Sequence, residues 1–238
     1  MGKLKNLGSK LLAGPYVIWM LLFTVIPLGL IIYNGFTNSD GRFTFKYVAA
    51  IADPVNAKPL LLSFEMSLIV TVVCLLLAFP LAVILSKYST DKNSFIVMIF
   101  ILPMWMNFML RTLAWRLILL NNGFLNQFLT MLGLSKVYLM NTKAAIIFGT
   151  AYDYFPFMVL PIYNAVVKID KDVINAAKDL GATNSVVLRK IILPLSVPGI
   201  VSGITMVLVP SMSEFVIADM LGGGKIYLIG NAIEQAFN

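Results

Sequence analysis

Residues 66–85 read MSLIVTVVCLLLAFPLAVIL and contain no charged side chain. An α-helix rises about 1.5 Å per residue, so a helix of this length crosses the ~30 Å hydrocarbon layer of a bilayer. The segment therefore predicts a transmembrane helix. It also holds Cys74, the single cysteine of the chain. A lone thiol forms no disulfide within the chain, so we expect Cys74 to pack as a small buried hydrophobe.

The composition of the whole chain agrees with a membrane location. Hydrophobic residues make up 59% and charged residues 12%, with a mean hydropathy of +0.88. Soluble domains average roughly 45–50% apolar and about 25% charged residues. A soluble fold of 238 residues would leave much of this apolar surface in water. We therefore predict an all-α integral membrane protein.

Four further apolar runs are long enough to span a bilayer, which gives five predicted transmembrane helices in a single domain over residues 1–238. Prolines inside several of these runs are compatible with membrane helices. The polar tail at residues 222–238 holds no further spanning run. The chain therefore has five spans, or a sixth helix lies beyond Asn238. The four further runs are residues 15–35, 95–120, 144–167 and 197–220.

The distribution of charge predicts the orientation. Lys and Arg are concentrated before the first run, between the second and third, and between the fourth and fifth, so the positive-inside rule places the N-terminus in the cytoplasm. The net charge of +7 is dispersed among apolar runs and does not predict a nucleic-acid surface. Histidine is absent, and we expect neither a metal nor a cofactor.

Two carboxylates lie within the predicted spans, where a charge costs at least ~2.5–3.5 kcal/mol. Asp153 is ~13 Å from the outer end of its run, and Glu214 falls in the outer leaflet. Two interpretations remain open. The carboxylates could line a pathway for a cationic substrate, or they could pair with arginines of the third run and brace the helices. The aromatic side chains that could join such a pathway are Trp105, Tyr152 and Tyr154, and the arginines are Arg111 and Arg116.

The predicted cytoplasmic loop at residues 168–194 has a helical pattern. Its first helix would start at an Asp170 N-cap, carry an apolar stripe and stop at Gly181. Thr183 or Asn184 could cap a second helix that ends at Pro194. The loop could lie on lipid headgroups or dock a partner. The predicted stripe consists of Val173, Ala177 and Leu180.

This loop resembles the EAA loop of ABC importer permeases. The family pattern is E-A-A, three residues, Gly, nine residues and I-x-L-P, and this chain departs from it only at the Glu. In that family the loop is the coupling helix seated in the ATP-hydrolysing subunit, so the resemblance implies an ATPase contact. The matching positions are Asn175 (in place of Glu), Ala176, Ala177, Gly181, Ile191, Leu193 and Pro194.

Further segments resemble spermidine/putrescine permeases of the PotB type. They include Leu102-Pro103-Met104-Trp105 with Leu110-Arg111-Thr112, the run at residues 156–161, and residues 219–223 with 228–231. The resemblance implies a type I ABC importer permease fold, normally of six helices, in the bacterial cytoplasmic membrane. Its substrates would be polyamines. Its partners would be an ATP-binding subunit dimer, a second paralogous permease, an extracellular or periplasmic substrate-binding protein, and membrane lipids.

Such a subunit would form a pore and would not be an enzyme. The run Gly222-Gly223-Gly224-Lys225 lacks the first Gly and the Ser/Thr of a phosphate-binding loop, so ATP hydrolysis is expected on a separate subunit. An ion-coupled secondary carrier or channel subunit, with Asp153 as its ion site, is the alternative. A membrane scaffold whose loop docks a regulatory protein is a third possibility. Co-purification with an ATP-binding subunit separates the three.

Overall fold

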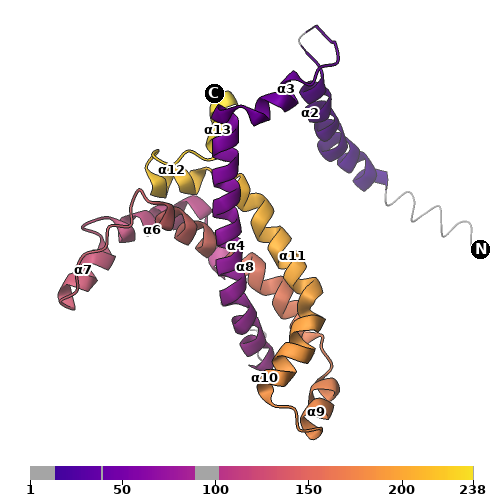
Figure 1. Ribbon diagram of the computed structural model, residues 1–238, viewed down its shortest axis with the longest axis vertical. Helices are drawn as coiled ribbons and strands as arrows, with labels where there is room; N and C mark the ends of the chain where they lie inside the picture. The colour runs from indigo at the N-terminus through magenta and orange to yellow at the C-terminus, as the bar shows by residue number, and fades with distance from the viewer. Residues whose placement is uncertain (1–13, 39, 89–101, 238) are drawn as a thin grey trace, which may run out of the picture. The chain divides into compact units, whose positions relative to one another are not determined.

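The computed structural model describes residues 14–38, 40–88 and 102–237, and these residues are largely helical (Figure 1). The only β-pairing among them is an isolated bridge between Thr37 and Phe43. The chain divides into two compact units, Met1–Ala57 and Lys58–Asn238. The all-α membrane fold is therefore confirmed. Four helices are long and apolar enough to cross a membrane: Gly14–Phe36, Pro54–Lys87, Lys143–Val167 and Asn184–Met212.

The first unit consists mainly of one spanning helix. This helix contains the π turn η1 (Leu21–Val25) and α2 (Ile26–Phe36). The short helices α3 (Lys46–Ala49) and η2 (Ala50–Ala52) follow. None of the apolar window of the spanning helix is buried within the first unit. Because such a surface is unstable in water, the helix requires an apolar environment that its own unit does not supply.

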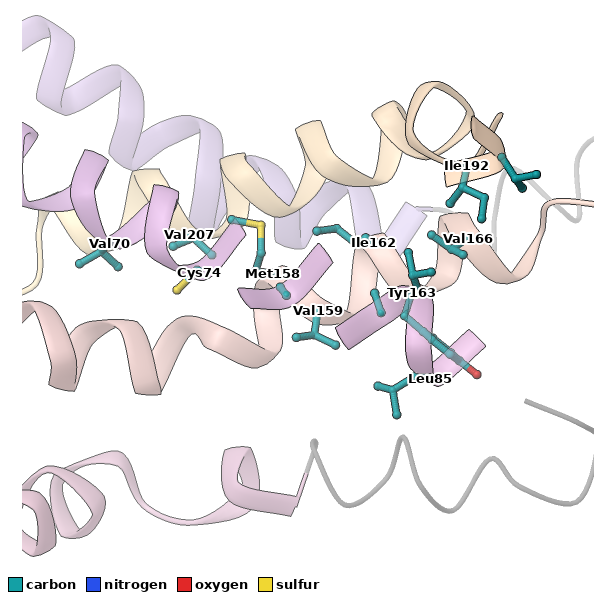
Figure 2. Close-up of a cluster of buried hydrophobic side chains, with 14 residues drawn as sticks. Val70, Cys74, Leu85, Met158, Val159, Ile162, Tyr163, Val166, Ile192 and Val207 are labelled. Carbon is teal, nitrogen blue, oxygen red and sulfur yellow. The ribbon is translucent and has the colours of Figure 1, made fainter. Parts of the chain in front are cut away.

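Three spanning helices of the second unit, α4 (Pro54–Tyr88), α8 (Lys143–Val167) and α11 (Leu193–Met212), share one apolar core. Figure 2 shows side chains from these helices meeting around Cys74, Met158 and Val207, all three fully buried. Cys74 therefore packs as the small hydrophobe that the sequence predicts. Its thiol lies 3.5 Å from the carbonyl oxygen of Ala151.

Small residues bring α8 and α11 into close contact. A Cβ added to Gly199 would lie 2.5 Å from the carbonyl oxygen of Pro161, and one added to Gly203 would lie 2.8 Å from the sulfur of Met158. The two glycines are four residues apart, a spacing that recurs where membrane helices pack backbone to backbone. The pair therefore sets the distance between the two helices.

The helix that leads into α11 corrects one prediction. Residues 184–212 form one continuous helix: α10 (Asn184–Val187), the π turn η3 (Leu188–Ile192) and α11. The prediction that this helix ends at Pro194 was wrong. Pro194 occupies the start of α11 directly after the π turn. A wider π turn removes the carbonyl clash that a proline ring makes in a regular α-helix, which explains why the helix continues.

The fifth predicted run, residues 197–220, is also shifted. The spanning helix ends at Met212 and a new helix, α12 (Val216–Gly222), begins after a break. Glu214 lies in this break and not within a spanning helix. The last described helix, α13 (Ile229–Phe237), is joined to α4 by a hydrogen bond from the Ile229 N–H to the Ser63 hydroxyl, 2.8 Å long.

The third predicted run, residues 95–120, is only partly described, because residues 95–101 lie outside the described residues. Its later part is broken at Asn107, whose side chain caps α6 (Phe108–Leu119) by accepting the N–H of Met109 at 2.9 Å. Helix α7 (Phe124–Met131) follows, and buried Asn126 exchanges two hydrogen bonds with the backbone of Val137.

Candidate functional site

An ion pair joins α6 to α8. Arg111 Nε lies 2.8 Å from Asp153 Oδ1, and the two side chains are only 9% and 8% exposed. Neither atom has another hydrogen-bond partner among the described residues. A charge buried at this depth is stable only when it is paired, so each member of the pair depends on the other. One of the pairings that the sequence left open, Asp153 with Arg111, is therefore present, and its role in bracing or in the pathway stays a prediction.

Three further groups hold the pair. Arg111 Nη1 donates to the carbonyl oxygen of Pro103 at 2.5 Å, and the guanidinium carbon lies 5.9 Å from the ring centroid of Tyr152. Such a cation–π distance is favourable. The hydroxyl of Thr112 lies 3.5 Å from Asp153 Oδ2 and donates more closely, at 2.9 Å, to the carbonyl of Phe108. The second oxygen of Asp153 is therefore held only weakly.

Glu214 is positioned by the break between α11 and α12. Its Oε1 accepts the N–H groups of Val216 and Ile217 at 3.1 and 3.3 Å, so the side chain caps the start of α12. Its Oε2 accepts the hydroxyl of Tyr154, on α8, at 3.2 Å. The carboxylate therefore ties α12 to α8 near the ion pair.

Both carboxylates line one cavity of about 430 Å³. Aromatic rings and methionines form most of the rest of its wall. Carboxylates beside aromatic faces are what an organic cation requires once it loses part of its hydration. The lining residues are Met104, Met106, Phe108, Arg111, Asp153, Tyr154, Phe157 and Glu214.

The predicted pathway residues are only partly brought together. Asp153, Glu214 and Tyr154 line the cavity. Tyr152 lies on another side of α8, with its ring 5.2 Å from the ring of Trp115. Trp105 is 73% exposed and is not part of the cavity wall. Their roles in transport stay predictions.

Arg116, the second predicted intramembrane charge, is exposed on α6. In the described part of the chain it forms no ion pair, whereas Arg111 does. The two arginines of the third run therefore have different surroundings.

Sequence reasoning did not identify Met104, Met106, Phe108, Thr112 or Phe157 as site residues. A signal was available for some of them. Phe157 follows Asp153 by four residues and Phe108 precedes Thr112 by four, spacings that place side chains on one helix face. The methionines precede α6 in a segment without periodicity, so spacing could not have indicated them.

The predicted coupling loop begins with the expected helix. Helix α9 (Lys171–Asp179) starts at Asp170, whose carboxylate accepts the N–H of Asp172 at 2.9 Å. Gly181 then adopts φ +84°, a left-handed conformation that favours glycine. Figure 1 places α9 and α10 at the end of α8 and α11 that lies opposite α12 and α13.

The apolar residues of this loop differ in their exposure. Ile174 and Ala177 pack against the core of the second unit. Leu180 is 90% exposed and Val173 is 47% exposed. Val173 and Ala177 lie on α9, whereas Leu180 directly follows the end of this helix at Asp179 and is turned away from the core.

The other residues of the loop motif fall into two groups. Ile191 packs against the core at the η3 turn, where the loop helix joins α11. Asn175 and Ala176 are exposed on α9, exposed Gly181 follows that helix, and Leu193 and Pro194 are exposed at the start of α11.

The family profile described as "Binding-protein-dependent transport system inner membrane component" matches residues 9–238. The chain belongs to this family. It is therefore a multi-pass membrane component of a binding-protein-dependent transport system. The match includes both the ion-pair cavity and the loop at residues 168–194.

Several curated relatives cover most of this permease. "Spermidine/putrescine transport system permease protein PotB" of Salmonella typhimurium (strain LT2) is 37% identical over 227 residues, which is 92% of this chain and 79% of that protein. The Escherichia coli K12 protein of that name is 36% identical, over 92% and 82% of the two chains. The Haemophilus influenzae protein is 34% identical over 242 residues, 98% and 85% of the two chains.

Solved structures share the fold. A bacterial ABC transporter involved in the import of the acidic polysaccharide alginate matches with a TM-score of 0.65 and 18% identity, over 100% of this chain and 87% of that chain. The alginate transporter in complex with alginate pentasaccharide-bound periplasmic protein gives a TM-score of 0.62 and 20% identity, over 97% and 81%. At these identities the match concerns the fold alone.

Proposed function

We propose that this permease moves polyamines such as spermidine and putrescine inward across the cytoplasmic membrane, driven by ATP. The names of the relatives at 34–37% identity support this substrate class. The observation that carries the proposal is the cavity that places Asp153 and Glu214 beside aromatic rings. A polyamine carries several ammonium groups, each of which needs an opposite charge or an aromatic face in a low-dielectric site.

The loop at residues 168–194 couples this movement to an ATP-binding subunit dimer. The spacing of the EAA-like motif supports this role, as does the exposure of Leu180 beside the left-handed corner at Gly181. An apolar side chain that is 90% exposed contributes nothing to the fold of this chain and is available to a partner. ATP hydrolysis takes place on that partner, so the permease itself is not an enzyme.

Three further partners complete the proposed assembly. A paralogous permease forms the second half of the pore, and an extracellular or periplasmic binding protein delivers the substrate. Membrane lipids surround the apolar faces that the protein subunits leave uncovered. The N-terminus lies in the cytoplasm, as the distribution of Lys and Arg predicts, which places α9 at the cytoplasmic side and Glu214 toward the opposite side.

The test of the substrate site is uptake of labelled spermidine by vesicles that contain the complete assembly. Asp153→Asn and Glu214→Gln are compared with wild type after matching the amount of folded protein. We expect each substitution to raise KM about tenfold or more, because each removes a charged hydrogen-bond acceptor worth ~1.5–3 kcal/mol. Unchanged uptake kinetics in both variants would exclude the cavity as the polyamine site.

A further inference from the structure

We propose that Asp153 is a binding site for an organic ammonium group, and that Arg111 occupies this site until the substrate displaces it. The identity of the substrate rests on the proposed function, whereas the cation site itself rests on geometry. In the structure the guanidinium of Arg111 holds the position that an ammonium group would take, 2.8 Å from Asp153 Oδ1 and in the wall of the cavity.

Asp153 has unused capacity to accept hydrogen bonds. A carboxylate offers about four lone-pair positions. Oδ1 contacts only Arg111 among the described residues, and Oδ2 receives one long contact of 3.5 Å from Thr112, whose hydroxyl binds Phe108 more closely. A second cation entering the cavity therefore makes a first contact with Oδ2 and gains Oδ1 only when the ion pair opens.

Arg111 retains other partners when it leaves Asp153. Its Nη1 already donates to the carbonyl of Pro103, and its guanidinium lies 5.9 Å from the ring centroid of Tyr152. Tyr152 is outside the cavity wall, so this contact does not compete with a substrate there. Displacement exchanges one cation for another beside Asp153, which avoids an uncompensated buried carboxylate.

This exchange makes Arg111 a determinant of specificity. A ligand that must open a closed pair binds with an apparent affinity equal to its intrinsic affinity multiplied by the fraction of time that the pair is open. A monoamine gains only the contact with Asp153, whereas a polyamine can also reach Glu214 in the same cavity. Arg111 therefore discriminates against small monovalent cations, and a substrate with two or more ammonium groups overcomes the competition.

Chemical rescue of Arg111→Ala tests the proposal without requiring transport. The thermal unfolding midpoint of the purified assembly is measured with ethylammonium chloride, with spermidine, and with sodium chloride at equal ionic strength. We expect the substitution to lower the midpoint and both amines to restore most of the loss, sodium chloride having little effect. The half-maximal spermidine concentration should be about tenfold or more below that of wild type, since the internal competitor is gone.

Two variants control this measurement. Arg116→Ala removes an exposed arginine of the same helix, and we expect no rescue by either amine. The double variant R111A/D153N lacks the carboxylate, so amines should not raise its midpoint. If Arg111→Ala does not fold, Arg111→Lys serves instead, because its ammonium group keeps the charge but has fewer donors. Its half-maximal spermidine concentration should then lie below that of wild type, but by less than the tenfold or more expected for Arg111→Ala.

Equal stabilisation of R111A and R111A/D153N by amines, or stabilisation of neither, would contradict the cation site. The outcome is independent of the proposed function. Rescue by ethylammonium in an assembly that takes up no spermidine would leave the site standing and refute the polyamine substrate. Spermidine uptake by the wild-type assembly, without rescue of R111A by ethylammonium, would support the polyamine substrate and refute the cation site at Asp153.

Discussion

Glu214 combines two roles that its sequence position did not indicate. One carboxylate oxygen accepts two backbone N–H groups at the start of α12, and the other accepts the hydroxyl of Tyr154. The carboxylate of Asp153, by contrast, accepts no hydrogen bond from the backbone of the described residues and is held by the side chains of Arg111 and Thr112. The two acidic residues of the cavity therefore differ: substitution of Glu214 disturbs a helix end, whereas substitution of Asp153 disturbs a charge pair.

Two substitutions separate the helix cap that Glu214 provides from the negative charge that it places in the cavity. We expect Glu214→Ala to lower the free energy of unfolding by about 0.5–2 kcal/mol, the usual cost of a lost N-terminal cap. Glu214→Gln keeps an acceptor oxygen and should cost less, although it removes the negative charge from the cavity. Thermal unfolding of the assembly measures the first effect. An equal loss for Gln and Ala would show that the cap depends on charge.

Tyr154→Phe isolates the hydroxyl contact with Glu214. It removes one hydrogen bond to a carboxylate, worth ~1.5–3 kcal/mol, and leaves the ring and both carboxylates in place. Spermidine KM should therefore change less than in Glu214→Gln. A larger effect of Tyr154→Phe would mean that the hydroxyl itself contacts the substrate.

At the scale of the helices, apolar run length predicted much of the fold. The runs at residues 15–35, 66–85 and 144–167 all lie within spanning helices, because a long apolar segment is favoured across a bilayer. Helix ends were predicted less well. A proline was read as a stop at Pro194, where a π turn allows the helix to continue, and hydropathy alone could not locate the break at Ser213.

The site was less predictable than the helices for a physical reason. Hydropathy indicates that Asp153 needs a partner but not which arginine supplies it, since that depends on how α6 packs against α8. Arg111 and Arg116 are both in the third run, and only the structure distinguishes them. The loop was easier: Asp170 and Gly181 act through the backbone, so their roles as cap and stop follow from residue type.

The contact between α8 and α11 should be intolerant of added volume. Gly199→Ala places a methyl group against the backbone of Pro161, which cannot move away, and overpacking of this kind costs about 1–3 kcal/mol. Gly29→Ala is the matched control, because nothing lies within 4 Å of its added Cβ. We expect a lower unfolding midpoint for Gly199→Ala only. Equal midpoints would show that the helices can separate without cost.

The exposed apolar corner of the loop gives a prediction about coupling. Leu180→Ser should leave the unfolding midpoint of the isolated permease unchanged, because the side chain is 90% exposed, yet lower the ATPase activity of the assembly that spermidine stimulates. Met131→Ser at the end of α7 is the control, since Met131 is 85% exposed but lies outside the loop. Equal ATPase activity in the two variants would argue against docking at Leu180.

For the whole molecule, the exposed apolar surface shows that this chain functions with other components around it. Even the core helix Lys143–Val167 of the second unit buries only 50% of its apolar window. A chain with so much uncovered hydrocarbon and a cavity in its second unit fits one part of a larger membrane assembly. Lipid covers some of these faces, and we propose that a second permease covers others.

We propose that ATP hydrolysis on a partner drives polyamines through this permease. The most direct test is the initial rate of labelled spermidine accumulation in vesicles that hold the complete assembly, with either ATP or an imposed ion gradient as the energy source. We expect accumulation with ATP that persists when a protonophore and a sodium ionophore abolish all ion gradients. Accumulation driven by an ion gradient without ATP would contradict the claim and favour an ion-coupled carrier.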